Sequence, residues 1–161
     1  MRYETENLIY LETSFVSYLT SRASRDLVVA ANQQITQEWW QVRRDGFELY
    51  VSQLVIQEAG AGDPVAAQQR LEALLEIPLL ELNEETLTFA EKLVQDGLLP
   101  PNAVEDALYI AVATLNGMDY LLTWNFKHLA NATVRYRIEQ ACRQLGYEPP
   151  IICTPQELLE E

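Results

Sequence analysis

Short apolar segments that are typical of β-strands alternate along this sequence with longer segments that have the apolar spacing of helices. The strand candidates are Leu8–Glu12, Phe47–Val51, Ile77–Leu82, Tyr120–Trp124 and Ile151–Thr154. Strands separated by helices need crossover connections, which make the strands parallel and put helices on both faces of the sheet. The sequence therefore predicts an α/β fold: a single three-layer domain over residues 1–161 with a central, mainly parallel sheet of four or five strands.

Residues that favour the start of a helix precede most of the helical segments between the predicted strands. Residues that can cap the first N–H groups of a helix precede the helical segments, namely Ser24, Ser52, Asp63, Asn83 and Asn131. Asn102 and Glu105 form a variant of the capping box before another helical segment, and Gly46 ends the first long one. The first strand candidate begins with an apolar run from Leu8 to Leu11, which predicts burial on both faces and a place near the centre of the sheet.

The chain is strongly acidic, with 11 Lys and Arg against 24 Asp and Glu and a formal net charge of −13. Such a field repels nucleic acid at long range and attracts cationic partners, so any nucleic-acid contact must be local. Cys142 and Cys153 have no motif spacing, which fits a reduced, cytoplasmic location. No apolar run is long enough to span a membrane, so we expect no membrane association.

Four polar side chains fall where the predicted fold would bring them to one edge of the sheet. Glu12 ends the first strand and Asn125 follows the fourth, while Glu58 and Asp106 lie early in two helices. Ligand sites of open α/β sheets lie beyond the carboxyl ends of the strands. Three carboxylates in one cleft repel one another unless a proton, an arginine or a divalent cation relieves the repulsion. Oxygen-only ligands favour Mg²⁺ or Mn²⁺ over zinc, and such ions promote attack on phosphorus.

Several of these features have ordinary interpretations. Taken singly, the four polar residues fit a solvated strand end, a surface charge, support for a helix cap and a turn residue. His128, the sole histidine, fits a capping or packing role better than catalysis. Trp39 and Trp40 could stack on bases, but adjacent tryptophans on an amphipathic helix more often pack in a core or a dimer. With Ile35 they form the apolar helical surface through which we expect a homodimer or a partner to associate.

The joint pattern resembles the PIN domain, the fold of many metal-dependent ribonucleases and of VapC-like toxins. The matching segments are LIYLETSFVSYL, LYVSQLVIQEA, VEDALYIAVATLNGMDYLLTWNFKHLAN and PIICTP, which together span nearly the whole chain. The acidic positions of the family fall on Glu12, Glu58 and Asp106, with the fourth on Asn125. Neighbouring hydroxyl residues fall on Thr13, Ser14 and Thr123.

The resemblance implies a function as well as a fold. It implies a ribonuclease that cleaves single-stranded RNA with Mg²⁺ or Mn²⁺, as the toxin of a type II toxin–antitoxin module that a cognate antitoxin blocks. Glu12, Glu58 and Asp106 would hold the metal and act in catalysis with Asn125, while the three hydroxyl residues would support them.

Two departures from the family pattern predict weakened activity. The first and fourth acidic positions are usually aspartate, whereas Glu12 is one methylene longer and Asn125 is neutral. The alternative function is therefore a catalytically impaired PIN-like protein that binds a partner or RNA without cleaving it. A flavodoxin- or receiver-like binding module fits less well, because the chain has no Gly-rich phosphate loop.

Overall fold

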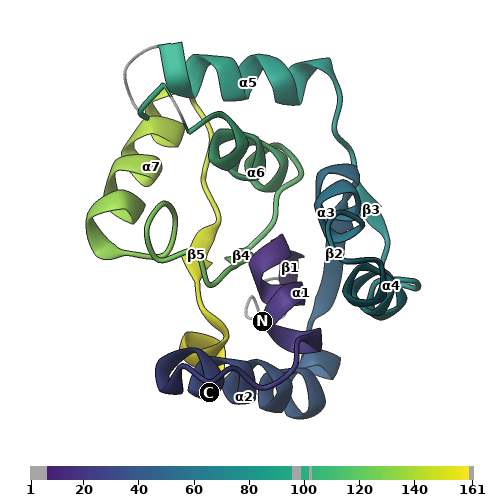
Figure 1. The fold of residues 1–161 in the computed structure, drawn as a ribbon. Coiled ribbons are helices and arrows are strands. Elements are labelled where there is room, and N and C mark those ends of the chain that lie inside the picture. The colour runs from purple at the N-terminus through teal and green to yellow at the C-terminus, as the bar shows by residue number, and fades with distance from the viewer. Residues whose placement is uncertain (1–6, 96–98, 102, 160–161) are drawn as a thin grey trace.

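The computed structural model describes residues 7–95, 99–101 and 103–159 and has a five-stranded, all-parallel sheet (Figure 1). The strands are β1 (Leu8–Leu11), β2 (Glu48–Ser52), β3 (Leu79–Leu80), β4 (Tyr120–Leu122) and β5 (Ile151–Cys153). Their order is β3-β2-β1-β4-β5, so β1 is central, with Tyr10 opposite Tyr50 on one side and Leu121 on the other. The α/β class and the central place of the first strand are confirmed.

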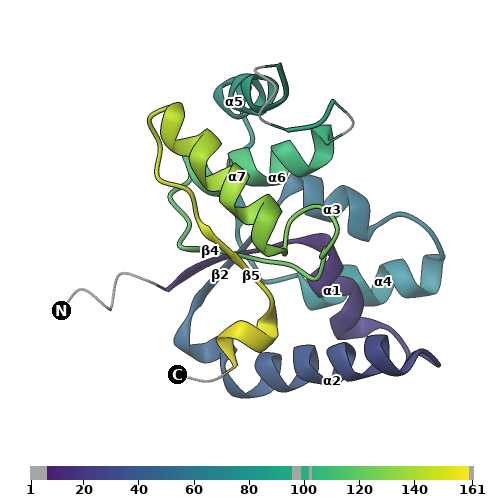
Figure 2. The ribbon, with the colours of Figure 1, turned by 90° about the vertical axis from the view of Figure 1, so that its left-hand side faces the viewer.

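Helices lie on both sides of this sheet. In the described part of the chain they are α1 (Thr13–Thr20), α2 (Leu27–Val42), α3 (Gln53–Ala59), α4 (Pro64–Ala73), α5 (Glu84–Gln95), α6 (Val104–Leu115) and α7 (Ala132–Gln144), with the 3₁₀ turns η2 (Arg44–Gly46) and η3 (Pro155–Leu158). Figures 1 and 2 show α5, α6 and α7 on one side of the sheet and α2 on the other. The crossover helices thus form the outer layers of a three-layer domain.

Most predicted helix starts are confirmed by their hydrogen bonds. The side chains of Ser52, Asp63, Asn83 and Asn131 accept hydrogen bonds from the backbone N–H groups of Val55, Ala66, Thr86 and Val134. The prediction that Ser24 caps α2 is wrong, because the cap is Asp26, whose Oδ1 accepts a hydrogen bond from Val29 N at 3.0 Å. The α-helix also ends at Val42, before the 3₁₀ turn that contains Gly46. Asn102 of the predicted capping box lies outside the described residues.

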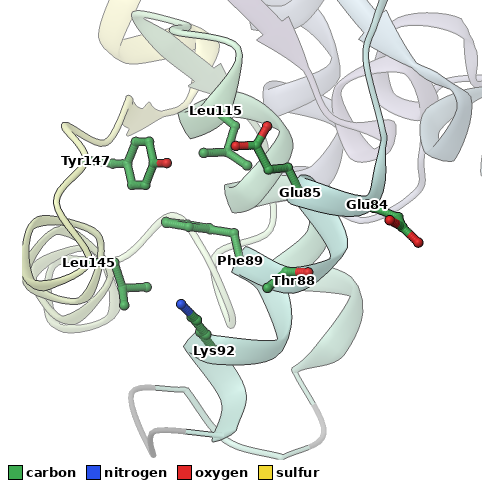
Figure 3. A pocket seen from close by; sticks show the side chains of 8 residues that line it. All are labelled: Glu84, Glu85, Thr88, Phe89, Lys92, Leu115, Leu145 and Tyr147. Carbon is green, nitrogen blue, oxygen red and sulfur yellow. The ribbon is translucent and has the colours of Figure 1, made fainter.

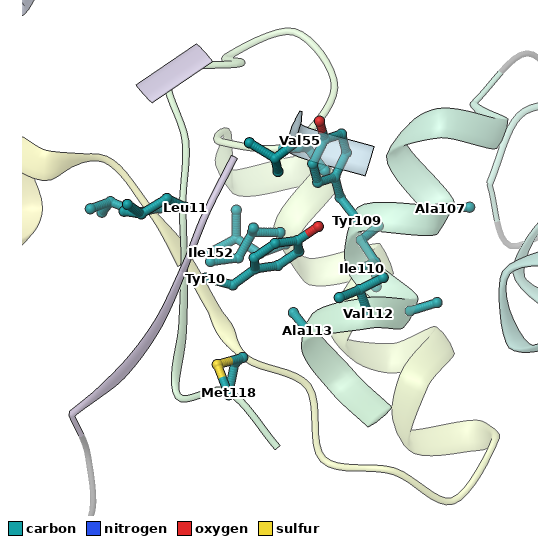
Figure 4. Close-up of a cluster of buried hydrophobic side chains, with 14 of the residues drawn as sticks. Tyr10, Leu11, Val55, Ala107, Tyr109, Ile110, Val112, Ala113, Met118 and Ile152 are labelled. Atoms are coloured by element: carbon teal, nitrogen blue, oxygen red, sulfur yellow. The ribbon is translucent and has the colours of Figure 1, made fainter. Parts of the chain in front are cut away.

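The core is built on β1 and α6 (Figure 4). Tyr10 and Tyr109 are buried, and their ring centroids lie 5.9 Å apart. The Tyr10 hydroxyl is hydrogen-bonded to Ser52 Oγ at 2.5 Å, which ties β1 to the start of α3. Burial raises the pKa of the Tyr10 hydroxyl, so this hydroxyl stays protonated.

Trp39 and Trp40 serve the fold rather than a free surface. The Trp39 ring is fully buried between Phe15 and Phe47, with centroid distances of 5.7 and 5.6 Å. Trp40 is half-buried against Phe15, and the Arg44 guanidinium lies 4.3 Å from its ring centroid. Core packing is therefore the correct interpretation of Trp39, and the predicted association surface loses one of its two tryptophans.

The two cysteines are buried free thiols, and burial raises their pKa values to about 11 for Cys142 and about 12 for Cys153. Among the described residues, no helix has both the length and the apolar character needed to cross a membrane.

Candidate active site

The parallel sheet brings the carboxyl ends of β1, β2 and β4 to the same edge of the molecule. Glu12 directly follows β1 and precedes α1, and Thr123 directly follows β4. Ser52 ends β2 and caps α3, so Glu58 reaches the same edge on the second turn of that helix. Asp106 lies in the first turn of α6. Glu12 and Thr123 thus reach this edge because they directly follow strands, whereas Glu58 and Asp106 reach it on helices.

Glu12 is held by two hydroxyl groups that act on the same oxygen. Glu12 is 7% exposed. Ser14 Oγ and Thr123 Oγ1 both donate to Glu12 Oε1, the second at 2.5 Å. Each hydroxyl also accepts a backbone N–H, from Trp124 at 2.8 Å and Asn125 at 3.0 Å. These N–H groups leave both hydroxyl hydrogens free to point at the carboxylate.

Glu58 is held in the same manner by a second pair of hydroxyls. Thr13 Oγ1 donates to Glu58 Oε1 at 2.7 Å, and the Tyr109 hydroxyl donates to the same oxygen. The two hydroxyls are 2.6 Å from each other. The hydroxyl hydrogen bonds to Glu12 and Glu58 all end on Oε1 of the respective carboxylate. Glu12 also accepts a hydrogen bond from the Ser14 backbone N–H. Among the described residues, no hydroxyl is bonded to Oε2 of either glutamate.

Asp106 is more loosely placed. Asn125 Nδ2 lies 3.5 Å from Asp106 Oδ1, and His128 Nδ1 lies 3.8 Å from Asp106 Oδ2. Asn125 Oδ1 accepts a hydrogen bond from the His128 backbone N–H at 3.1 Å, so this amide also shapes the turn after β4. Asn125 therefore shapes the turn after β4 and also lies beside Asp106, so the two expected roles of this residue are compatible.

In the described part of the chain, no ion pair joins a Lys or Arg to Glu12, Glu58 or Asp106. The one basic group at ion-pair distance from any of these carboxylates there is His128, beside Asp106. Burial raises the pKa of Glu12, although its hydrogen bonds from Ser14 and Thr123 act in the opposite direction. Burial also raises the pKa of Asp106, while nearby His128 lowers it and the Glu58 charge raises it. The Glu58 charge acts on both of the other carboxyls.

The predicted residues meet in three small groups rather than in one. Glu12 lies with Ser14 and Thr123, Glu58 lies with Thr13, and Asp106 lies with Asn125. Over residues 7–95, 99–101 and 103–159, no three His, Cys, Asp or Glu side chains form a group that could hold a metal ion. Close convergence of all three carboxylates stays a prediction.

Tyr109 is a site residue that the sequence reasoning missed. Its hydroxyl contacts both Thr13 and Glu58, and hydrogen bonding to Glu58 adds to burial in raising its pKa. The available signal was its position three residues after Asp106, because side chains with this spacing share one face of a helix. His128, expected to cap or pack, is instead half-exposed beside Asp106.

Comparison with known proteins identifies no family for this chain. No protein-family model matches the chain, and a search of curated proteins likewise finds no match. The resemblance to PIN domains therefore stays a prediction based on the residues quoted above.

Proposed function

We propose that this chain is a divalent-cation-dependent ribonuclease of the PIN class that cleaves single-stranded RNA. The observation that carries the proposal is the set of three carboxylates at the carboxyl edge of the sheet, with no Lys or Arg paired to them among the described residues. Glu12 is buried, and Glu58 and Asp106 are half-buried. Carboxylates withdrawn from water without a paired Lys or Arg cost folding free energy, and groups kept at such a cost are frequently functional.

The donor set fits Mg²⁺ or Mn²⁺, because it consists of carboxylate and amide oxygens. Glu12, Glu58 and Asp106 would hold the ion, and the Asn125 carbonyl would bind it or its water. A bound ion would lower the pKa of a coordinated water and offset charge on the phosphoryl group. Ser14 and Thr123 orient Glu12, while Thr13 and Tyr109 orient Glu58, so the chain fixes both carboxylates before a substrate arrives.

The test combines manganese titration by calorimetry with cleavage of a labelled RNA in the presence and absence of chelator. Asp106→Asn should abolish cleavage. Asn125→Asp should raise metal affinity and cleavage about tenfold, because a returned carboxylate would add roughly 1.4 kcal/mol of transition-state stabilisation. Asn32→Asp, which adds the same charge on α2, is the matched control and should change neither quantity.

A second candidate function follows if wild type and Asn125→Asp both fail to bind metal and to cut RNA. The chain would then be a PIN-like protein that binds RNA or a partner without cleavage. The separate hydrogen-bonded groups around the carboxylates and the neutral Asn125 favour this candidate. Under either function we propose a cytoplasmic location and, by the resemblance, a cognate antitoxin or a second copy as partner.

A further inference from the structure

A small pocket opens directly beside Asp106. Its volume is about 110 Å³, and it is lined by Leu99, Pro100, Ala103, Asp106, Ile110, Lys127, His128, Val134 and Arg137. Pockets that enclose whole small-molecule ligands have volumes of roughly 300–1,000 Å³. This pocket therefore suits one chemical group of a larger ligand that continues along the surface.

The rim of this pocket is basic in a chain that is otherwise acidic. Lys127, His128 and Arg137 line it together with a single acidic residue, Asp106. Four other pockets in the described part of the chain have either no basic residue or more acidic than basic ones. With a net charge of −13, a pocket of this composition marks a local exception to the anionic field.

The two permanent cations on the rim are available to a ligand. Lys127 and Arg137 are exposed, and neither side chain forms an ion pair with another described residue. Lys127 lies in the turn after β4 and Arg137 lies on α7. Asn131 joins these two elements, because its Nδ2 donates to Phe126 O at 2.6 Å and to Lys127 O at 3.3 Å while its Oδ1 caps α7.

We propose that this pocket binds a backbone phosphate of a single-stranded polynucleotide and positions the strand across the carboxylates. Lys127 and Arg137 would donate to the phosphate oxygens, and the apolar lining would contact the adjoining sugar. His128 would separate this phosphate from the Asp106 carboxylate, which it already approaches to 3.8 Å. The substrate class rests on the proposed function, whereas the phosphate subsite rests on the charge and shape of the pocket.

The experiment measures binding of a fluorescent single-stranded RNA by anisotropy in chelator, so that no cleavage occurs. The chain contains only two lysines, which supply a matched pair of variants. Lys92 lines a separate pocket with Phe89 and Tyr147, between α5 and the chain that follows α7 (Figure 3). Lys127→Gln and Lys92→Gln make the same change in net charge at exposed positions. Arg137→Gln tests the second rim cation.

Lys127→Gln and Arg137→Gln should each raise Kd about threefold or more and reduce the salt dependence of log Kd by about 0.7, the value for one phosphate contact with a single strand. Lys92→Gln should leave Kd and the salt dependence unchanged. A single-stranded DNA of the same sequence should show the same losses, because the phosphate is common to both. Inorganic phosphate should displace the RNA less effectively from the two rim variants than from wild type.

Equal effects of all three variants would overturn the subsite, because they would report only the overall field. Unchanged affinity in both rim variants, losses confined to RNA, or no oligonucleotide binding by wild type would overturn it as well. The proposed function is separable from these outcomes. A chain that loses binding on Lys127→Gln but cuts no RNA with manganese keeps the subsite and loses the nuclease activity.

Discussion

Hydroxyl side chains decide how the glutamates of the candidate active site are held. Thr123 directly follows β4, and Thr13 and Ser14 begin α1 just after Glu12, so a polar cluster at the edge of the sheet could be predicted from the sequence alone. Which hydroxyl donates to which glutamate could not be predicted, because this depends on the rotamers that meet after β1 and β4 have come together. Tyr109 illustrates the limit, since its position three residues after Asp106 indicates the shared helix face but not that its hydroxyl will reach Glu58 on another helix.

Glu12, the buried carboxylate of the candidate active site, provides a test of what burial of its charge costs. Its folded-state pKa is raised mainly by burial. Between its unfolded pKa and that raised value the folded state binds more protons, so stability falls as pH rises through this window, and the cost is complete above it. Glu12→Gln removes the charge and keeps an oxygen that can accept from both hydroxyls.

We therefore expect Glu12→Gln to raise the free energy of unfolding by about 1 kcal/mol and Tm by about 2–4 °C at about pH 8. The gain should shrink as pH falls towards the unfolded value of about 4.3. Thermal denaturation at a series of pH values measures the gain at about pH 8 and its decrease at lower pH. Glu38→Gln, at an exposed position on α2, is the control and should show neither effect. A loss of stability in Glu12→Gln at about pH 8 would mean that the Glu12 charge stabilises the fold.

Individual elements differ in how well their sequences predict them. Helix α1 was missed because its sequence, TSFVSYLT, is rich in β-branched, hydroxyl and aromatic residues, which have low helix propensity. Tertiary packing overrides that preference, since Phe15 and Val16 are fully buried. Strand β3 is shorter than the predicted Ile77–Leu82, and it is an edge strand that follows Pro78, a residue without an N–H for the ladder. Pro78 contributes only its carbonyl, which accepts from Val51 N at 3.0 Å.

The start of α7 offers a prediction at this scale. Asn131→Ala removes the helix cap and the contacts to the turn after β4, so it should lower the free energy of unfolding by about 1–2 kcal/mol. Asn131→Asp keeps the capping oxygen but cannot donate to Phe126 O. It should retain most of the stability, while hydrogen exchange of the Leu129 and Ala130 amides, which donate to Asn125 O, becomes faster.

Asn83→Ala is the matched control, because Asn83 caps α5 by the same kind of bond and its side-chain hydrogen bonds among the described residues go to Thr86 rather than to that turn. It should reduce stability to a similar extent and leave exchange at the two amides unchanged. Equal exchange rates in Asn131→Asp and wild type would show that the side-chain donor does not hold the turn.

At the scale of the whole molecule, the net charge of −13 and the candidate active site both favour cations. Excess like charge destabilises a compact state, so any salt should stabilise this fold to some extent. A bound divalent ion acts differently, because it stabilises the folded state according to its own affinity and concentration. General screening and site binding can therefore be separated by their dependence on single carboxylates.

We expect Mn²⁺ to raise Tm well beyond NaCl of matched ionic strength. At a free concentration of 100 times Kd the gain is about 2.7 kcal/mol, or roughly 5–11 °C for a chain of this size. Asp106→Asn should lose most of this manganese-specific shift, whereas Glu38→Gln should keep it, although both variants remove one negative charge. Differential scanning fluorimetry over a manganese titration, with a parallel NaCl series for each variant, measures the difference. If manganese acts no more strongly than matched NaCl, or stabilises Asp106→Asn as much as wild type, the carboxylates at the sheet edge do not form a metal site, and the shift belongs to the acidic surface as a whole.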